Sequence, residues 1–435
     1  MIDYSIFQNQ NRWRSNPDFF KRQAFLKRHV FRELIKWLDD EEMIVISGSR
    51  QVGKSTLMLM LIQHLLDVKK CAATDIFYFN LDERSLHPLF QSTSLLIDFL
   101  KLGSNQDKKY LFIDEFQKIP DAGNFMKALF DLKLQVKIIV SGSSSLEIAK
   151  DKEMLTGRKQ VFFVYPFSFE EFIEYDNPEL ACMENLDFTK KNLQQFFLKY
   201  MTYGGYPRIL LEDNTEKKAL KLKEIHSSYL EKDILNLIKI ENIEKFNKLI
   251  YLLASQVGNL VNKNEISSTL ALNMATTERY LSILSGTYIF DYVSPYFNNP
   301  RKEISKMPKV YINDLGLKNI IETQSFILRE TGSMVENFVY NELKIKLKEK
   351  LKFWRTQTKA EVDFVIDNGS SVIPIEVKYT ERKPEITGGL LSFYKKYQPQ
   401  RILMITKDYF STESYETAII EYVPVYALNR ISIFK

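Results

Sequence analysis

One nine-residue stretch restricts the fold of this chain more than any other feature of the sequence. Residues 48–56 read GSRQVGKST and fit the pattern G-x-x-x-x-G-K-[ST]. The stretch directly follows a short apolar segment, MIVIS at 43–47, and precedes the helical pattern LMLMLIQHLL. A glycine-bearing turn between a buried strand and a helix presents backbone N–H groups and the positive helix end to phosphate oxygens. The sequence therefore predicts a phosphate-binding loop in an α/β domain.

Each residue type of this loop has an expected task. Gly48 and Gly53 let the backbone curl, and Lys54 is expected to reach the β- and γ-phosphates of a nucleotide. Ser55 is expected to coordinate Mg²⁺ through its hydroxyl, and Thr56 to support the α-phosphate. The other loop residues face the phosphates through their backbone: Ser49, Arg50, Gln51 and Val52. The alternative is an ordinary glycine-bearing turn, which the strand and helix on either side disfavour.

A second apolar run, YLFIDE at 110–115, supplies the carboxylates that nucleotide hydrolysis needs. Asp114 is expected to hold Mg²⁺ from the end of a buried strand, and Glu115 to act as general base toward water. The next run, KIIVSGSSS, ends in hydroxyls where a γ-phosphate contact is expected, and the sequence does not choose among Ser141, Ser143 and Ser144. An acidic pair at a strand end can also be a solvated loop.

Short apolar runs that alternate with helical patterns predict a parallel sheet with both faces covered. Besides those named above, the runs lie at 76–82, 137–143 and 160–166, and an amphipathic helix is expected over 19–40. A helical stretch with a hairpin-like end follows, and from about Pro308 strands and helices mix again. The chain is therefore expected to have three domains, over 1–180, 181–300 and 301–435.

Composition excludes several classes of protein. The 435 residues are 45% apolar and 26% charged, which disfavours a disordered or fibrous chain. Two cysteines are too few for a disulfide framework, and no run reaches the roughly 18 to 20 apolar residues of a membrane span. We therefore expect a cytoplasmic protein without a membrane partner. The net charge is +5, but residues 301–359 alone carry 13 basic and 7 acidic side chains.

Residues 245–295 have the pattern of a winged helix-turn-helix. As a DNA-binding module it would offer Thr276, Thr277 and Arg279 from its third helix to a groove. That helix is not notably basic. The alternative is a module that only packs the first domain against the last.

The last third of the chain contains a second constellation of charged residues. Glu336 lies on a predicted helix, Asp363 in the run AEVDFVID, and Glu376 and Lys378 in PIEVKY. Residues two apart on a strand share one face, so Glu376 and Lys378 point the same way. If the two strands are antiparallel neighbours, Asp363 and Glu376 can meet and bind a divalent cation, with Lys378 placed to orient water or steady phosphoryl charge.

The order of the motifs resembles a known family. The glycine-rich loop, IDEFQ, IIVSGSSS, LTGR at 155–158, VYPFSFEEF at 164–172 and GGYP at 204–207 are similar to the AAA-type domain of a prokaryotic P-loop ATPase family. Its members carry a C-terminal domain of unknown function with a restriction-endonuclease-like fold. The resemblance implies ATP with Mg²⁺. It also implies an arginine that answers the γ-phosphate charge, with Arg158 as first candidate and Arg208 as second, although either can be a packing residue.

The C-terminal pattern of a helical glutamate followed by D-x12-E-V-K resembles the PD-(D/E)xK nucleases, which cut phosphodiester bonds with Mg²⁺ or Mn²⁺. The resemblance implies catalytic roles for Glu336, Asp363, Glu376 and Lys378, and a second cation on Asp363 and Glu376. Val362 stands where the motif's leading proline would be, at a variable position. The basic run 344–352 and the aromatic residues after it suit a nucleic-acid backbone, or form a solvated helix face.

Two functions follow from these patterns. In the first, ATP hydrolysis is coupled to binding of nucleic acid, with DNA favoured, and the last domain cuts it. In the second, the chain is an ATP-dependent regulatory switch, and the nuclease-like domain is an inactive surface for a protein partner or for assembly. An arginine that acts across subunits would require a homo-oligomer.

Overall fold

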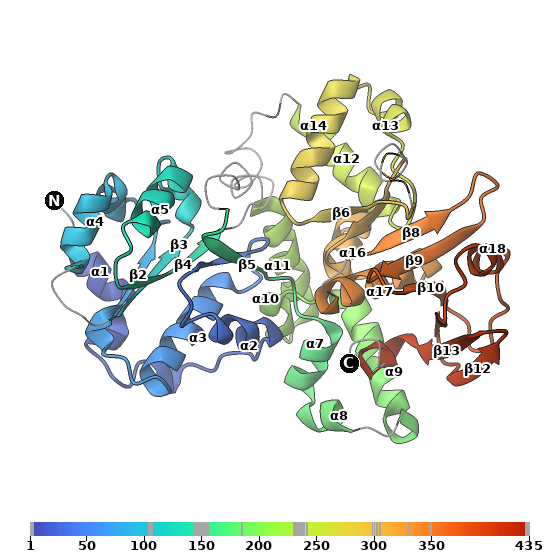
Figure 1. The fold of residues 1–435 in the computed structure, drawn as a ribbon, viewed down its shortest axis with the longest axis horizontal. Helices are drawn as coiled ribbons and strands as arrows, with labels where there is room; N and C mark the ends of the chain where they lie inside the picture. Colours follow the sequence, from blue (N-terminus) through green and yellow to red (C-terminus); the bar gives the residue numbers. More distant parts are fainter. Residues whose placement is uncertain are drawn as a thin grey trace. The chain divides into compact units, whose positions relative to one another are not determined.

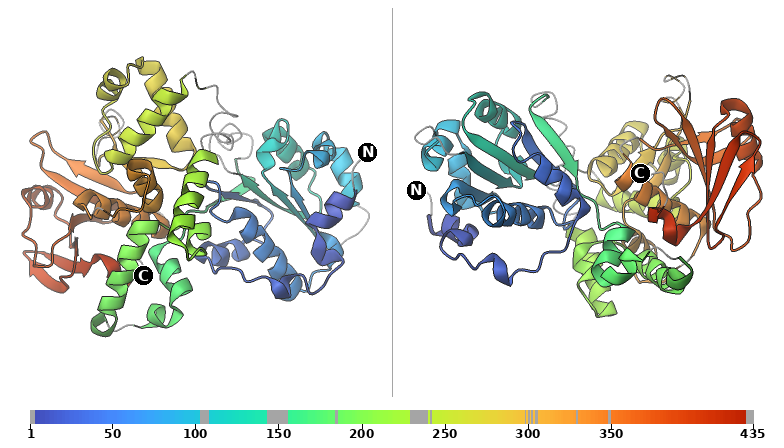
Figure 2. Two further views of the ribbon diagram at one scale, coloured as in Figure 1. Left: turned by 180° about the vertical axis from the view of Figure 1, so that it is seen from behind. Right: turned by 60° about the horizontal axis from the view of Figure 1, so that its bottom comes forward.

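The computed structural model describes residues 4–430 except 103–107, 143–155, 184–185, 229–239, 241, 298, 300, 302, 304–305, 329 and 348–349. The chain divides into two compact units, drawn in Figures 1 and 2. Unit 1 comprises Met1–Tyr165 with Gly286–Tyr288, and unit 2 comprises Pro166–Ser285 with Ile289–Lys435. No helix in the described ranges is both long and apolar enough to cross a membrane.

Unit 1 is built on a five-stranded parallel sheet, as the alternation of apolar runs predicts. Its strand order is β2-β3-β4-β1-β5. The strands are β1 (Met43–Ser47), β2 (Ile76–Asn80), β3 (Lys109–Asp114), β4 (Val136–Gly142) and β5 (Lys159–Phe163). Strand β4 thus lies between the strand that precedes the glycine-rich loop and the strand that ends in Asp114. The carboxyl ends of all five strands meet at one edge.

Helices cover both faces of this sheet (Figures 1 and 2). Phe7, Leu96 and Met126 pack in one core with Val45 and Ile113 of the sheet. They come from α1 (Tyr4–Gln10), α4 (Thr93–Leu100) and α5 (Ala122–Asp131). The other face is covered by α2 (His29–Lys36) and α3 (Lys54–Asp67), which contact each other and, through α3, β4. The sheet is therefore buried on both sides, which explains its nearly continuous apolar strands.

The predicted helix over 19–40 is wrong in its first half. A short 3₁₀ turn, η2 (Phe20–Arg22), is followed by extended chain, and helix α2 begins at His29. Arg28 precedes it with β-type backbone angles, and its guanidinium donates to the carbonyl oxygens of Val52 and Tyr165 at 2.8 and 2.7 Å. A buried tertiary contact thus overrides the local helical pattern.

The N-terminal segment covers the edge strand β2 through side-chain amides. Asn11 donates to the carbonyl of Tyr78 at 2.9 Å and accepts from its backbone N–H at 2.8 Å. Gln10 makes the same pair of bonds with Asn80, at 3.2 and 2.9 Å. These four bonds replace those that a neighbouring strand would make, so the backbone of β2 is satisfied on its outer side.

Unit 2 begins with helices and ends with a mixed sheet. The first helices are α7 (Phe169–Asp176), α8 (Pro178–Cys182), α9 (Leu186–Tyr203), α10 (Pro207–Leu210) and α11 (Thr215–Ser228). Three more follow, α12 (Ile243–Ser255), α13 (Lys263–Thr269) and α14 (Met274–Gly286). An antiparallel ribbon, β6 (Phe290–Val293) with β7 (Lys309–Ile312), then leads to α16 (Leu315–Thr323) and α17 (Gly332–Lys346).

The six-stranded sheet of unit 2 has the order β12-β13-β11-β10-β9-β8. Its strands are β8 (Lys352–Arg355), β9 (Glu361–Asp367), β10 (Val372–Lys378), β11 (Arg401–Thr406), β12 (Ser411–Tyr415) and β13 (Ala418–Pro424). Helix α17 shares one core with Phe364 and Leu403, whereas α18 (Gly388–Tyr397) shares another with Val365 and Met404. Since neighbouring residues of a strand face opposite sides, the two helices cover opposite faces.

Strand β7 is fixed to helix α17 by a buried amide. Asn337 accepts a hydrogen bond from the backbone N–H of Ile312 at 2.8 Å and donates to its carbonyl at 2.7 Å. Asn341 donates to the same carbonyl at 3.1 Å. Strand β7 therefore has a defined register against α17, and its first residue, Lys309, has a fixed place in the site described below.

Candidate functional site

The two glycines of the glycine-rich loop in unit 1 are needed for different reasons, Gly48 for close packing and Gly53 for its backbone angle. A Cβ on Gly48 would lie 2.1 Å from the carbonyl oxygen of Val164, so no larger residue fits. Gly53 has a φ of +97°, in the region that favours glycine, and α3 begins at the next residue. Arg28 adds the bond to Val52 given above. Sequence analysis missed this arginine, because only the folded chain brings it to the loop.

Lys54 closes the loop from inside. Its ammonium is nearly buried and donates to the carbonyl oxygens of Gly48 and Ser49, each at 2.9 Å. A lysine that bridges two carbonyls of its own loop is already positioned where the loop curls. The Lys54 ammonium can donate to a phosphate oxygen once it gives up one of its two hydrogen bonds to these carbonyls. The loop therefore fits a nucleoside triphosphate.

Asp114 emerges from the end of β3 into a cluster of hydroxyl groups. It is 1% exposed and accepts hydrogen bonds from Tyr78 at 2.9 Å and from Ser141. The Ser55 side chain lies near the same hydroxyl and lowers its pKa, as the smallest of the contributions to it. Burial, followed by the nearby Asp114 charge, raises the pKa of Tyr78 far above its usual value, so this hydroxyl keeps its proton and donates.

Tyr78 therefore links the loop serine to the strand carboxylate, and sequence analysis did not single it out. The available signal was a polar hydroxyl in the middle of the apolar run IFYFN. Ser55, Asp114 and their hydroxyl neighbours form an oxygen-rich set of the kind that Mg²⁺ binds together with phosphate oxygens. The residues present thus fit Mg²⁺ at this position.

The other predicted residues of unit 1 differ in their placement. Glu115 has a φ of +57°, and its Oε2 accepts from Gln117 at 2.5 Å. Ser141 points its hydroxyl at Asp114, so as it stands it is committed to the carboxylate rather than to a phosphate. Ser143 and Ser144 lie outside the described residues.

Arg158 lies at the opposite edge of the sheet from the glycine-rich loop, too far round to contact a γ-phosphate bound by its own chain. Its carbonyl accepts from the N–H of Met43, at the amino end of β1, whereas the glycine-rich loop follows the carboxyl end. Its guanidinium donates to Asp131 at 2.8 Å. This pairing suits the packing role that was the alternative for Arg158. The second candidate, Arg208, pairs with Glu224 at 2.9 Å in unit 2.

The C-terminal residues lie together, around a lysine that sequence analysis did not predict. Lys309 is 2% exposed, and its Nζ lies 2.9 Å from Glu336 Oε1, 2.7 Å from Glu361 Oε1 and 3.9 Å from Asp363 Oδ1. Tyr311 also donates to Glu336, at 2.6 Å. Burial raises the pKa of Glu336 to about 7, with the Asp363 charge as the next cause.

Strands β9 and β10 pair antiparallel, and their register runs to Ile375 opposite Phe364. Continued by one residue, it sets Glu376 opposite Asp363, the arrangement on which the predicted site depends. Asp363 accepts from the backbone N–H of Val377 at 2.8 Å. Glu376 is 3% exposed, and burial raises its pKa to about 7.

Glu376 uses only one of its two carboxylate oxygens. Oε1 receives Lys378 at 2.9 Å and the hydroxyl of Thr387 at 3.3 Å. Oε2 is buried and has no hydrogen-bond partner within the described part of the chain. This oxygen is thus the group of the cluster whose hydrogen-bonding capacity is unused.

The predicted second cation does not fit this arrangement. Lys309 approaches Glu336, Glu361 and Asp363, while Lys378 holds Glu376, so ammonium groups already compensate the carboxylates. In the described ranges, no three or more His, Cys, Asp or Glu side chains are grouped so that they could hold a metal ion. The roles predicted for Asp363 and Glu376 as metal ligands therefore lack support from the geometry.

Two predicted nucleic-acid contacts are also corrected by burial. Thr277 is fully buried and bonds to Ser267 and to the carbonyl of Asn273, so it is not available to a DNA groove. The aromatic residues after the basic run, Phe353 and Trp354, are 1% and 3% exposed and belong to the core. Three lysines of the run are paired with carboxylates: Lys344 with Asp291, Lys346 with Glu170 and Lys352 with Glu303.

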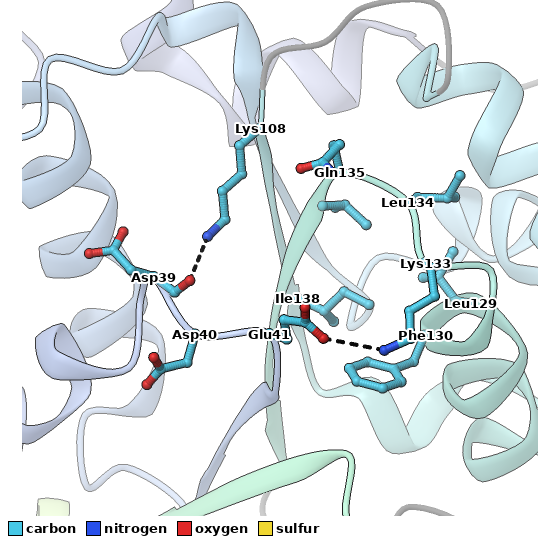
Figure 3. A pocket seen from close by; sticks show the side chains of 11 residues that line it. Asp39, Asp40, Glu41, Lys108, Leu129, Phe130, Lys133, Leu134, Gln135 and Ile138 are labelled. Atoms are coloured by element: carbon cyan, nitrogen blue, oxygen red, sulfur yellow. Dashed lines mark hydrogen bonds and ion pairs between the residues drawn. The ribbon is translucent and has the colours of Figure 1, made fainter.

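A surface pocket of unit 1 lies apart from the glycine-rich loop (Figure 3). It is lined by residues before β3 and at the start of β4, at the amino ends of the strands. Its polar groups are paired, Lys108 with the carbonyl of Asp39 at 3.1 Å and Lys133 with Glu41 at 3.3 Å. The pocket thus belongs to neither constellation.

Three family models match successive parts of the chain. Residues 40–173 match an AAA domain, residues 194–325 match a domain of unknown function (DUF8612), and residues 331–428 match another (DUF4143). The first match spans the sheet of unit 1 from β1 to β5. Together with the loop geometry, it supports an AAA-type ATPase domain. The other two matches name no activity.

Relatives in distant organisms match most of this chain. An uncharacterized protein of Haemophilus influenzae is 25% identical over 403 residues, which is 89% of this chain and 94% of the relative. An uncharacterized protein of Methanocaldococcus jannaschii is 26% identical over 361 residues, 81% of this chain and 77% of the relative. The similarity thus extends over most of the chain.

Solved structures match at low TM-scores. The S. cerevisiae Hsp104:casein complex in its extended conformation has a TM-score of 0.31 and 14% identity, over 60% of this chain and 50% of that one. The replication initiator DnaA bound to AMPPCP and single-stranded DNA has a TM-score of 0.26 and 14% identity, over 60% of this chain and 90% of that one.

Proposed function

We propose that this chain is a Mg²⁺-dependent ATPase that works as a regulatory switch, and that its C-terminal domain is a catalytically inactive surface for a partner. The observation that carries the first part is the loop of unit 1, where Lys54 already bridges Gly48 and Ser49 and Asp114 stands beside Ser55 through Tyr78. The AAA-domain match over residues 40–173 supports it independently.

The loop and the end of strand β3 would divide the tasks of hydrolysis between them. MgATP supplies the phosphoryl group to be transferred and the cation that offsets its charge. The backbone N–H groups of the loop and Lys54 would bind the phosphates, and Ser55 and Asp114 would hold Mg²⁺. Glu115 would take a proton at its carboxylate from the attacking water, after release of the Gln117 amide that now occupies Oε2.

The inactive C-terminal surface is supported by the pairing of its carboxylates. Lys309 and Lys378 compensate the residues that a metal-dependent nuclease would use to bind its cation. Without that cation, the pattern D-x12-E-V-K keeps the shape of a nuclease-like site but not its chemistry. A protein partner or a second copy of the chain would then be the target of the switch.

A second candidate function is ATP-driven binding and cleavage of nucleic acid. It is favoured by the register of β9 and β10, which sets Asp363 opposite Glu376 with Lys378 two residues further on. It is disfavoured by the burial of Thr277, Phe353 and Trp354.

Two assays separate these functions. The first measures phosphate release from ATP with Mg²⁺ by the wild type and by Lys54→Ala, with and without DNA. The second measures nicking of plasmid DNA with Mg²⁺ or Mn²⁺ by the wild type and by Asp363→Ala, with and without ATP. We expect hydrolysis that depends on Lys54 and no nicking. Nicking that disappears in Asp363→Ala would establish the second candidate, and undiminished turnover in Lys54→Ala would refute the ATPase site.

A further inference from the structure

One buried ammonium stands at the centre of the C-terminal carboxylate cluster. Lys309 Nζ lies within 3.0 Å of both Glu336 and Glu361 and 3.9 Å from Asp363. The ring of Phe353, centred 5.6 Å away, covers it as well. The lysine therefore has the surroundings that a bound cation would have, with carboxylate oxygens from a helix and a strand around it.

We propose that Lys309 is a built-in cation, which takes the place of a divalent metal ion and makes the C-terminal cluster independent of metal. The buried ammonium would explain why the C-terminal domain of the proposed function is catalytically inactive. The inference rests on that proposed function only where it assigns the domain to a partner. The ATPase site plays no part in it.

The ammonium is fixed in place by the fold. Lys309 is the first residue of β7, and its backbone pairs with Val293 of β6. Three residues further on, Asn337 of α17 holds both the N–H and the carbonyl of Ile312. Glu336 is the neighbour of Asn337 on the same helix. The same docking thus sets both the lysine and its carboxylate partner, and withdrawal of the ammonium would require breaking a buried part of the core.

The side chains of the cluster compensate all but one of its negative charges without a metal ion. Four carboxylates are near one another, and three cations accompany them, since Arg355 pairs with Glu361 at 3.1 Å. The members are Glu336, Glu361, Asp363 and Glu376, with Lys309, Lys378 and Arg355.

A divalent ion would have to enter beside this ammonium. Two like charges a few ångströms apart repel each other strongly in a poorly solvated site, and Lys309 already occupies the Glu336 and Glu361 oxygens that face it. Binding would therefore require that the ion displace Lys309. Replacing the lysine with an uncharged side chain of similar length should remove this competition and open the position between the three carboxylates to a cation.

The test uses the full chain without nucleotide and Mn²⁺ as the probe, with binding followed by the loss of the free-ion EPR signal. We compare the wild type, Asp363→Asn, Lys309→Met and the double variant Lys309→Met/Asp363→Asn. We expect Lys309→Met to bind one Mn²⁺ at least tenfold more tightly than the wild type, and the double variant to lose this gain. Mn²⁺ should also raise the unfolding temperature of Lys309→Met.

The matched control is Lys318→Met, which removes another buried lysine of unit 2 that pairs with a single carboxylate, Glu322 at 2.7 Å. It should gain no Mn²⁺ site. A wild type that binds Mn²⁺ and loses it in Asp363→Asn overturns the proposal, and so does a folded Lys309→Met that binds none. If Lys309→Met does not fold, equal binding by the wild type and Asp363→Asn supports the proposal, because it shows that the cluster holds no metal. Loss of ATP hydrolysis in Lys54→Ala is measured separately and reports only on the ATPase.

Discussion

Each of the two units holds acidic side chains in a poorly exposed cluster, but the groups that donate to these side chains differ. In unit 1, Asp114 accepts from the hydroxyls of Tyr78 and Ser141, which are neutral groups. In unit 2, Glu336 and Asp363 face the ammonium of Lys309. A hydroxyl can give way to a cation and then bind beside it, whereas an ammonium already supplies the charge. A buried acidic residue can therefore belong to a metal site or to a site without metal, and the group that donates to its carboxylate decides which.

The largest effect is expected from a substitution in the glycine-rich loop, which would place ATP hydrolysis in unit 1. Lys54→Ala should lower kcat for ATP hydrolysis at least about 1,000-fold, equivalent to about 4 kcal/mol, because the loop loses the cation that meets the terminal phosphates. Phosphate release measures this. Asp363→Asn in unit 2 is the matched control and should stay within about twofold of the wild type. Equal losses in both variants would contradict the division of roles.

The second prediction concerns the ammonium of unit 2. Lys309→Met should lower the free energy of unfolding by about 3 kcal/mol at pH 8, because buried carboxylates lose their compensating charge. Urea denaturation measures the change. Lys36→Met removes an exposed lysine paired with Glu33, and should cost less than about 0.5 kcal/mol. A small effect at Lys309 would mean that its carboxylates are compensated in some other way.

The third prediction concerns the hydroxyls of unit 1. Tyr78→Phe removes a donor to a buried carboxylate, which should lower the free energy of unfolding by about 1.5 kcal/mol without Mg²⁺. Denaturation with and without MgATP gives the comparison. Since a bound cation can stabilise Asp114 in place of the hydroxyl, the deficit should shrink when MgATP is present. A deficit that stays constant would show that the tyrosine has no connection with the cation.

The fourth prediction uses pH. Burial gives Glu376 a pKa of about 7 in the folded chain, against an ordinary value of 4.5. The folded state therefore binds the proton more tightly, and the stability from this group is lost as pH rises through 7. In Glu376→Gln, the fall in unfolding free energy between pH 5 and pH 8 should be smaller by on the order of 1 kcal/mol. Identical pH profiles for the two proteins would exclude this carboxyl as the titrating group.

The smallest effect is expected at Arg158. Since this residue lies at the amino ends of the strands, Arg158→Ala should leave hydrolysis by the isolated monomer within about twofold of the wild type. Assays over a range of protein concentrations check this. A tenfold loss in the monomer would contradict the placement, whereas a loss found only in the oligomer would assign the arginine to the neighbouring subunit's site.

Much of unit 1 could be predicted from the sequence, because its signals are local. Apolar runs set the five strands, and the spacing of Gly48, Gly53 and Lys54 set the loop. The predicted helix over 19–40 failed where Arg28 is extended to reach Val52, a contact between residues far apart in the chain. Propensity does not register such contacts.

The C-terminal cluster shows the same limit more sharply. Period-two spacing correctly placed Glu376 and Lys378 on one strand, and the antiparallel pairing with the strand of Asp363 was predicted as a condition. Lys309 was not predicted, because a lone lysine at the start of the run KVYI carries no motif. Its role arises from a ribbon that docks on a helix, and this docking decides whether the cluster can take a metal.

The amide bonds from Gln10 and Asn11 to β2 have a consequence for assembly. An open strand edge invites a strand from another molecule to extend the sheet, which leads to fibres or to domain exchange. Here the outer side of β2 is occupied at Tyr78 and Asn80 by the chain's own side chains. A second copy of this protein therefore cannot pair a strand with the outer edge of β2 unless the N-terminal segment first detaches. Removal of residues 1–11 would leave the outer edge of β2 open to strand pairing and would favour aggregation.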